Sequence, residues 1–411
     1  MKKLFYSTTF RGIALAISIG VALVACQSEQ DLSLPDSQEL EIIKYQNGDI
    51  IPGKYIVTLN PTGLNLRKDM SYESVQATMR KTGSSILAKY RIADANIEHV
   101  YGSTIEGFSV SLTDEQYQVL VKDPSVLRIE PDRIIALAPP PGKGPGSGGG
   151  GGSTGQTIPW GITRVGGPVD HTGALKPKAY IIDTGIDLDH PDLNVSNEGF
   201  NAFTSGRDAG SIDDGNGHGT HVAGTVAAIN NSIGVVGVAA GALVVPVKVL
   251  DSRGSGSYSG VIAGVNYVGA NGGTGDVANM SLGGPVSQAL DDAVLAASSK
   301  VKFAIAAGNS SANAANYSPA RVNGINIYTI SAMNSSDVFA TFSNFGNPPI
   351  DFVAPGVSIN STWKDGGYNT ISGTSMAAPH VAGILLFGGS VNSGGTVKND
   401  PDGNPDTIAV R

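Results

Sequence analysis

Hydrophobic and polar residues follow two different patterns on either side of a glycine-rich segment. Before that segment, β-branched and aromatic runs at 54–59, 107–112 and 126–129 predict strands. Helical spacing predicts a helix near 72–82 and a second helix that starts after Thr113, whose hydroxyl can cap its first turn. Residues 52–138 are therefore expected to form a small α+β domain.

Beyond the glycine-rich segment, short apolar runs alternate with helical patterns. The predicted strands are 179–182, 243–250, 277–280 and 303–307, and helices are predicted from about 219, near 258–268 and near 286–298. Apolar strands separated by helices are typical of a parallel sheet that is covered on both faces. We therefore predict an α/β fold, a parallel β-sheet with helices on both faces, for residues 155–395, followed by a polar tail at 396–411.

Composition narrows the class of protein. The chain has 411 residues, of which 15% are charged and 55 are glycines, which excludes a coiled coil and a charge-rich disordered chain. The net charge of −8 argues against nucleic acid as a partner. The single cysteine, Cys26, excludes an intramolecular disulfide and a multi-cysteine metal cluster. Residues 139–154, rich in proline and glycine, are expected to be a flexible linker between domains.

The N-terminus has the pattern of an export signal. Basic residues precede an uncharged stretch at 12–25, which is too short to span a bilayer. It ends in Leu-Val-Ala-Cys26, which resembles the lipobox of bacterial lipoproteins and implies a signal peptide at 1–25 and lipidation of Cys26. The alternative is an ordinary cleavage site with an incidental cysteine. Residues 27–51 form a polar, acidic spacer, and in a two-membrane host Gln27 would favour the outer membrane.

Three polar residues stand at the ends of predicted elements. Asp183 follows an apolar strand, where open α/β sheets place their ligands, although a lone Asp there is more often a cap. His218 precedes an apolar helix, and its neighbours Gly217 and Gly219 are expected to leave its ring open to a cleft. Ser375 lies where a small-residue turn enters a helix, whose dipole would favour an oxyanion. Taken alone, Ser375 could equally be a plain N-cap.

The order Asp, His, Ser along the chain is that of subtilisin and differs from the orders in chymotrypsin and the α/β-hydrolases. Residues 182–187 (IDTGID), 217–225 (GHGTHVAGT) and 373–383 (GTSMAAPHVAG) resemble the three active-site motifs of subtilisin-like serine proteases. The resemblance covers about 156–390, and residues 52–138 resemble the inhibitory propeptide of that family. It implies a secreted serine endopeptidase that is made as a zymogen.

The resemblance also implies a mechanism. Ser375 would be the nucleophile, His218 the base that removes its proton, and Asp183 the carboxylate that orients the imidazole. The backbone N–H of Ser375 and the side-chain amide of Asn309 would stabilise the oxyanion on the way to an acyl-enzyme. The alternative for Asn309 is a turn residue after a strand.

Substrate would add as a strand to two edges of the catalytic domain. The resemblance assigns these edges to Ser281, Leu282 and Gly283 and to Gly254, Ser255 and Gly256. The primary pocket, walled by Leu282, 306–308 and 316–318, carries no charge, so we expect a broad apolar or aromatic P1 preference. Self-cleavage is expected near Leu137 and Ala138, which leaves Cys26 on the propeptide side and releases a soluble protease from a membrane-anchored precursor.

A structural Ca²⁺ ion is implied as well. The matching positions, whose oxygen donors suit a hard cation, are Gln156, Asp192, Ile229, Asn231, Ile233 and Val235. The alternative is a solvated surface loop. The chain departs from the family pattern after the serine helix, where a glycine-rich stretch at 388–395 replaces the further helices that members usually have.

Rival functions explain fewer of these residues. A zinc hydrolase could use His218 and His221 as ligands but leaves Ser375 and Asn309 without a role. A non-enzymatic binding protein on a degenerate protease scaffold would be expected to lack at least one of the four candidate catalytic residues. No G-x-G-x-x-G run follows a predicted strand, which argues against a nucleotide-binding domain. The expected partners are protein or peptide substrates and the chain's own propeptide, and we expect a monomer.

Overall fold

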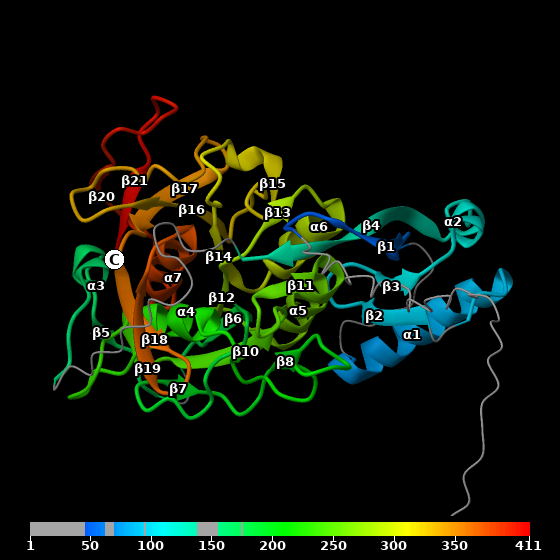
Figure 1. The fold of residues 1–411 in the computed structure, drawn as a ribbon, viewed down its shortest axis with the longest axis horizontal. Coiled ribbons are helices and arrows are strands. Elements are labelled where there is room, and N and C mark those ends of the chain that lie inside the picture. Colours follow the sequence, from blue (N-terminus) through cyan, green and yellow to red (C-terminus); the bar gives the residue numbers. More distant parts are fainter. Residues whose placement is uncertain (1–45, 62–69, 94–95, 138–154, 174–175) are drawn as a thin grey trace, which may run out of the picture. The chain divides into compact units, whose positions relative to one another are not determined.

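The computed structural model describes residues 46–61, 70–93, 96–137, 155–173 and 176–411 (Figure 1). The expected signal peptide, Cys26, most of the spacer, Ala138 and the linker lie outside the described residues. The chain divides into the units Met1–Lys44 and Tyr45–Arg411, and all described residues belong to the second unit. Among the described residues no helix is long and apolar enough to cross a membrane.

The N-terminal domain is an antiparallel sheet with two helices, which agrees with the predicted α+β class, although the strand at 97–101 was not predicted. Its sheet has the order β4-β1-β3-β2. Ser71 caps the first helix, and Thr113 with Gln116 forms a capping box at the start of the second. The elements are β1 (Ile50–Leu59), α1 (Tyr72–Lys89), β2 (Ile97–Tyr101), β3 (Gly107–Ser111), α2 (Asp114–Leu120) and β4 (Val126–Ala136).

The second domain is built on a ten-stranded, mainly parallel sheet with the order β20-β21-β17-β16-β14-β12-β6-β10-β7, with β8 paired to β10 off this path. Its helices are α3 (Trp160–Arg164), α4 (His218–Ala227), α5 (Tyr258–Asn271), α6 (Gln288–Ala297), the 3₁₀ turn η2 (Ala314–Asn316) and α7 (Thr374–Leu385). Its strands are β5 (Val169–Asp170), β6 (Ala179–Asp183), β7 (Asn194–Val195), β8 (Phe200–Asn201), β9 (Ala239–Ala240), β10 (Leu243–Lys248), β11 (Ser255–Ser257), β12 (Val277–Met280), β13 (Gly284–Pro285), β14 (Lys302–Ala306), β15 (Tyr317–Ser318), β16 (Ile327–Met333), β17 (Ile350–Pro355), β18 (Ile359–Trp363), β19 (Gly367–Ile371), β20 (Asn392–Thr396) and β21 (Thr407–Val410).

Helices cover both faces of this sheet, which confirms the predicted fold class (Figure 1). Along β6, Ala179 and Ile181 join a core cluster with α4 and α7, whereas Tyr180 and Ile182 join a second cluster with α5 and α6. Successive side chains of a strand point to opposite faces, so a strand buried on both faces must be apolar throughout. The continuous apolar runs in the sequence are the consequence of this arrangement.

The C-terminal segment extends the sheet. The sequence pattern assigned no element to residues 396–411, but β21 pairs with β17 in parallel and β20 pairs with β21 in antiparallel register. Ile408 and Val397 pack in a small core with Met333 and Val353. Strands rather than further helices therefore follow α7. A few apolar residues anchor these strands, but they are too few to produce a periodic pattern in the sequence.

The N-terminal domain is joined to the catalytic domain by strand pairing and by helix capping. Ile134 to Ala136 of β4 pair with β11 in antiparallel register. Glu130 accepts hydrogen bonds from Ser287 Oγ and Ala289 N at the start of α6, and Asp132 accepts from Ser259 N and Oγ at the start of α5. Helix N-termini favour negative charge, so these two carboxylates hold β4 against the first turns of α5 and α6.

Removing one of these carboxylates should loosen the N-terminal domain. We expect Asp132→Ala, made in a full-length Ser375→Ala chain, to weaken the association of β4 with α5 by about 1 to 3 kcal/mol of free energy. The reason is that Ser259 N and Ser259 Oγ both lose the carboxylate to which they donate. Hydrogen–deuterium exchange of peptides from β2 and β4 should accelerate. Asp114→Ala, an exposed carboxylate in the first turn of α2, is the matched control and should not change exchange. Equal exchange in the two variants would contradict this role of Asp132.

Candidate active site

The carboxyl ends of three adjacent strands carry the predicted catalytic residues. In β6, Ile182 lies opposite Met280 of β12, and Met280 lies opposite Ile305 of β14. Asp183, Ser281 and the 306–309 segment therefore emerge side by side at one edge of the parallel sheet. This edge is where open α/β sheets place their ligands, as predicted from Asp183 alone.

Asp183 and His218 form a buried pair. Nδ1 of His218, the first residue of α4, lies 2.8 Å and 2.9 Å from the two carboxylate oxygens of Asp183, which is fully buried. A carboxylate can only accept, so Nδ1 carries the hydrogen and Nε2 is left free to accept a proton. Burial lowers the pKa of His218, but the charge and hydrogen bond of Asp183, with the charge of Asp214, outweigh it and leave this pKa raised.

Ser375 lies in the first turn of α7. Its hydroxyl donates to Ser281 O at 3.1 Å, and Ser281 Oγ donates to Ser375 O at 2.8 Å. Among the described residues no hydrogen bond joins Ser375 to His218. Catalytic hydrogen bonds often tighten only when substrate is bound, so the missing hydrogen bond does not count against Ser375 as the candidate nucleophile.

The side-chain amide of Asn309 is oriented by the residue before Ser375. Asn309 Oδ1 accepts hydrogen bonds from Thr374 N and Thr374 Oγ1, both at 2.9 Å, and Gly308 N donates to Thr374 Oγ1. Because Oδ1 is occupied, Nδ2 is the group left for a ligand. Thr374 was not singled out in the sequence, and only its place beside Ser375 could have drawn attention to it.

Two predicted substrate edges are in contact with the N-terminal domain. Leu137 N donates to Gly254 O at 2.9 Å, which continues the pairing of β4 with β11. On the other side, Asn47 Oδ1 accepts from Ala136 N, while Asn47 Nδ2 donates to Gly283 O. Sequence reasoning missed Asn47, because nothing local marks an asparagine in a polar spacer as a contact of this edge.

The glycines around His218 do not open its ring to a cleft, contrary to the sequence prediction. A Cβ on Gly219 would lie 2.1 Å from Gly185 O, and one on Gly217 would lie 2.3 Å from the ring of Trp363. His218 is 9% exposed. These glycines are therefore needed for close packing of α4 against the strand end of Asp183 and against β18.

The predicted calcium ligands gather around one point. Asp192 accepts from Asn231 Nδ2 at 2.7 Å and Val235 N at 3.0 Å. Gln156 Nε2 donates to Ile229 O at 2.8 Å and Val235 O at 3.2 Å and reaches Asn231 Oδ1 at 3.4 Å. Ile233 contacts the cluster through its N–H, which donates to Asn231 Oδ1. Tyr368, which the sequence did not indicate, donates to Asp192 Oδ2.

This cluster fits a cation chemically. Two main-chain carbonyls and an amide oxygen converge on the Gln156 nitrogen, so the point they surround already favours a positive group. Burial raises the pKa of Asp192, and the hydrogen bonds that it accepts from Val235 N, Asn231 and Tyr368 offset this only in part. The donors are oxygens of the kind that Ca²⁺ prefers.

His221 and His380 are buried and neutral. His221 Nε2 lies 3.1 Å from Ile359 O and 3.2 Å from Asn369 O, and His380 Nδ1 lies 2.8 Å from Met376 O. Burial lowers the pKa of His221 to about 3 and that of His380 to about 4. Nε2 of His221 thus donates to carbonyls and cannot also bind zinc. Within the described residues no group of three His, Cys, Asp or Glu could hold a metal ion.

The arrangement suits a serine hydrolase: it has a buried carboxylate paired with an imidazole, a serine in the first turn of a helix, and an amide held beside that serine. Comparison with known proteins identifies the class. A subtilase family model matches residues 178–397, and a peptidase inhibitor I9 model matches residues 54–138. The chain belongs to the subtilase family, whose members are serine proteases that hydrolyse peptide bonds.

Named relatives agree with this assignment. The chain is 39% identical over 365 residues to alkaline serine exoprotease A of Vibrio alginolyticus, covering 86% of this chain and 63% of that protein. It is 39% identical over 339 residues to M-protease of Shouchella clausii, covering 81% and 80%. A solved cold-adapted subtilisin-like serine proteinase is 40% identical, with a TM-score of 0.51, over 61% of this chain and 96% of that one.

The two buried histidines should make the protein sensitive to acid. Their pKa values lie below 6.5 in the folded state, so only the unfolded state takes up their protons as the pH falls from about 6.5 towards 4. Each should lower the free energy of unfolding by up to about 1.4 kcal/mol per pH unit in that range. Buried Asp291, Asp351 and Asp406, each with a pKa raised to about 6, act in the opposite direction, so the histidine share is measured as a difference. Urea unfolding at pH 7.5, 6.0 and 5.0 compares the Ser375→Ala chain with its His221→Gln form, in which stability should fall less as the pH falls. Equal pH dependence in the two chains would contradict the prediction.

Proposed function

We propose that the protein is a secreted serine endopeptidase that hydrolyses polypeptides through an acyl-enzyme. The observation that carries this proposal is the strand β4, which lies on β11 and leads Leu137 along Gly254 beside the candidate catalytic residues. A site that holds an extended segment of its own chain by main-chain hydrogen bonds suits an extended polypeptide substrate.

The residues of the site take the following roles. His218 Nε2 removes the proton from Ser375 Oγ, which attacks the substrate carbonyl, and Asp183 stabilises the imidazolium. Ser375 N and Asn309 Nδ2 donate to the oxyanion. His218 then gives its proton to the departing amine, and a water molecule hydrolyses the acyl-enzyme by the same steps in reverse.

The pocket beside this site suits uncharged side chains. The residues assigned to its walls, Leu282, 306–308 and 316–318, carry no ionisable group other than the Tyr317 phenol. An apolar or aromatic P1 residue would leave no charge unpaired there. We therefore infer broad apolar or aromatic P1 preference.

The N-terminal domain acts as an intramolecular inhibitor until it is cut. Three contacts support this. β4 pairs with β11, Asp132 and Glu130 accept from the first turns of α5 and α6, and the Asn47 side chain lies between Ala136 and Gly283. Cleavage follows Leu137, near Ala138, and the precursor is anchored by a lipid on Cys26. The released protease then acts outside the cell or at its surface.

A structural Ca²⁺ ion would be held by Asp192, Gln156 and Asn231 with the carbonyls of residues 229, 233 and 235. When bound it supplies positive charge to a buried carboxylate and cross-links the N-terminal segment of the catalytic domain to the loop after α4. Ile229 O, Val235 O and Asn231 Oδ1 accept hydrogen bonds from Gln156 Nε2 here, so the ion would replace these hydrogen bonds.

The catalytic assignment is tested with chains covering residues 27–411. Wild type should cut itself near Leu137 and digest casein, whereas Ser375→Ala should stay full length, because no nucleophile is left. Removing the amide equivalent to Asn309 in subtilisin costs about 10² to 10³ in turnover, and we expect Asn309→Ala to lose a similar factor. N-terminal sequencing, mass spectrometry and casein hydrolysis over time give the answer. Equal cutting of wild type and Ser375→Ala would overturn the assignment.

The calcium site is tested by the midpoint of thermal unfolding in a Ser375→Ala chain. Added Ca²⁺ at 100 times its Kd should stabilise the folded chain by about 2.7 kcal/mol, since it binds only the folded loop. Asp192→Asn should abolish the increase, whereas Asp189→Asn, three residues earlier, should keep it. An equal increase in both variants would place the ion elsewhere.

A further inference from the structure

The first turn of α4, which carries His218, is held by side chains from outside the helix. The first N–H groups of a helix have no partner within it. His218 N donates to Asn216 Oδ1 at 3.2 Å, Gly219 N to Thr184 Oγ1 at 2.9 Å, and Thr220 N to Asp214 Oδ2 at 2.9 Å. The position of the imidazole therefore depends on Thr184 and Asp214 as well as on its own pair with Asp183.

Asp214 is the centre of this arrangement. It is 4% exposed, and its two oxygens accept five hydrogen bonds, from Thr184 Oγ1, Asn216 N, Gly217 N, Thr220 N and Thr220 Oγ1, at 2.7 to 2.9 Å. No lysine or arginine is among these partners. Every contact is a donor, so an amide nitrogen in place of either oxygen would face another donor.

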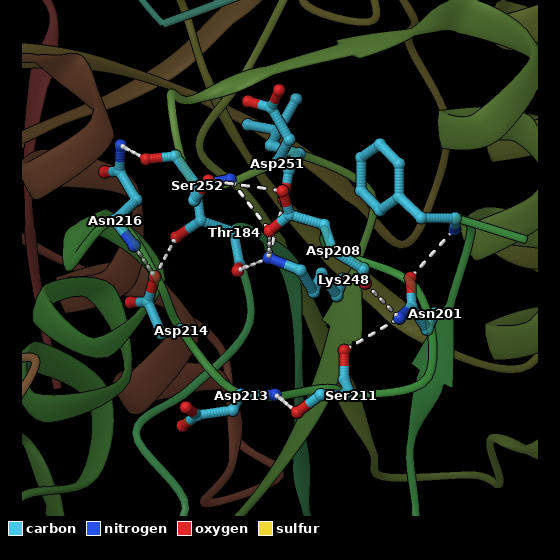
Figure 2. A network of polar contacts seen from close by, with 12 residues as sticks. Thr184, Asn201, Asp208, Ser211, Asp213, Asp214, Asn216, Lys248, Asp251 and Ser252 are labelled. Atoms are coloured by element: carbon cyan, nitrogen blue, oxygen red, sulfur yellow. Dashed lines mark hydrogen bonds and ion pairs between the residues drawn. The ribbon is translucent and has the colours of Figure 1, made fainter. Parts of the chain in front are cut away.

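Thr184 connects this carboxylate to the strand end of Asp183. Its hydroxyl donates to Asp214, and its carbonyl accepts from Lys248 Nζ at 2.7 Å (Figure 2). Lys248 is 1% exposed and also contacts Leu250 O and Asp208. The residue that follows Asp183 is thus clamped between a buried cation and a buried carboxylate.

We propose that Asp214 is a positioning residue for the reaction: it ties the strand end of Asp183 to the helix start of His218 and favours the imidazolium that forms during catalysis. This inference rests on the proposed function, because it assigns His218 as the base. It adds a second carboxylate to the site, from the loop before α4, and leaves the roles of Ser375 and Asn309 unchanged.

The charges around His218 support the second part of this proposal. The Asp183 carboxylate hydrogen-bonds the imidazole, and the Asp214 carboxylate accepts from the main chain on either side of His218, at Gly217 N and Thr220 N; both charges raise the pKa of His218. On its own helix the neighbouring His221 is neutral, because burial lowers the pKa of His221 to about 3. The ammonium of Lys248 on β10 donates to Thr184 O and pairs with Asp208.

The test compares Asp214→Asn with Asp213→Asn. Asp213 is the exposed residue directly before Asp214, and its carboxylate accepts one long hydrogen bond, from Leu188 N. The control therefore removes the same charge from an adjacent position. We expect Asp214→Asn to lower kcat at least tenfold with little change in KM. The acid limb of kcat/KM against pH should move down by about half a unit to one unit, because the protonated imidazole loses a nearby negative charge. Asp213→Asn should change neither.

A measurement without catalysis separates this inference from the proposed function. In the Ser375→Ala background, NMR titration of the His218 ring should show the same downward shift for Asp214→Asn relative to Asp213→Asn. If wild type has no Ser375-dependent activity, the proposed function fails, yet the titration still reports the coupling. Titration midpoints that agree within about 0.2 units, with equal kcat, would overturn the role of Asp214.

A second variant covers the case in which Asp214→Asn does not fold. Thr184→Val keeps the carboxylate charge but removes the hydroxyl that joins Asp214 to Gly219 N. We expect a several-fold lower kcat and an acid limb within about 0.2 units of wild type, because positioning is lost while the charge stays. An unchanged kcat in Thr184→Val would overturn the positioning role.

Discussion

The register of three parallel strands is the constraint on which the candidate site depends. Because β6, β12 and β14 pair without a shift, Asp183 at the end of β6 emerges level with Ser281 after β12 and the segment to Asn309 after β14, at the carboxyl edge of the sheet. A slip of one residue would turn Asp183 towards the opposite face, since side chains alternate along a strand. The core clusters on the two faces, each filled by alternate residues of β6, hold this register in place.

Around this edge, the N-termini of several helices obtain a hydrogen-bond partner from outside the helix. Asp214 contacts α4, Asp132 contacts α5, Glu130 contacts α6, and Asn309 contacts α7 through Thr374. A helix N-terminus carries unpaired donors and a partial positive charge, so a carboxylate or amide oxygen fits each of them. The same chemistry thus positions the helices that carry His218 and Ser375 and holds the N-terminal domain.

The N-terminal domain contacts the second domain by more than strand pairing alone. One side of β4 pairs with β11, whereas the contact with Gly283 on the other side is made through the amide of Asn47. A side-chain amide that donates on one side and accepts on the other can replace a missing main-chain pair. Asn47, at the end of the predicted spacer before β1, is therefore part of the contact between the two domains.

The sequence by itself determined the α/β fold, most of the strands and helices around the site, and the residues that the family resemblance assigned to catalysis. It could do so because apolar periodicity and short motifs are local, and each element needs only its own residues to be seen. Tertiary structure alone decided the orientation of Asn309, the role of Asp214 and Thr184, the contact of Asn47 and the strand β21 in a segment that reads as a polar tail. Each of these depends on a partner far along the chain, and no pattern within either segment records which partner the fold brings to it.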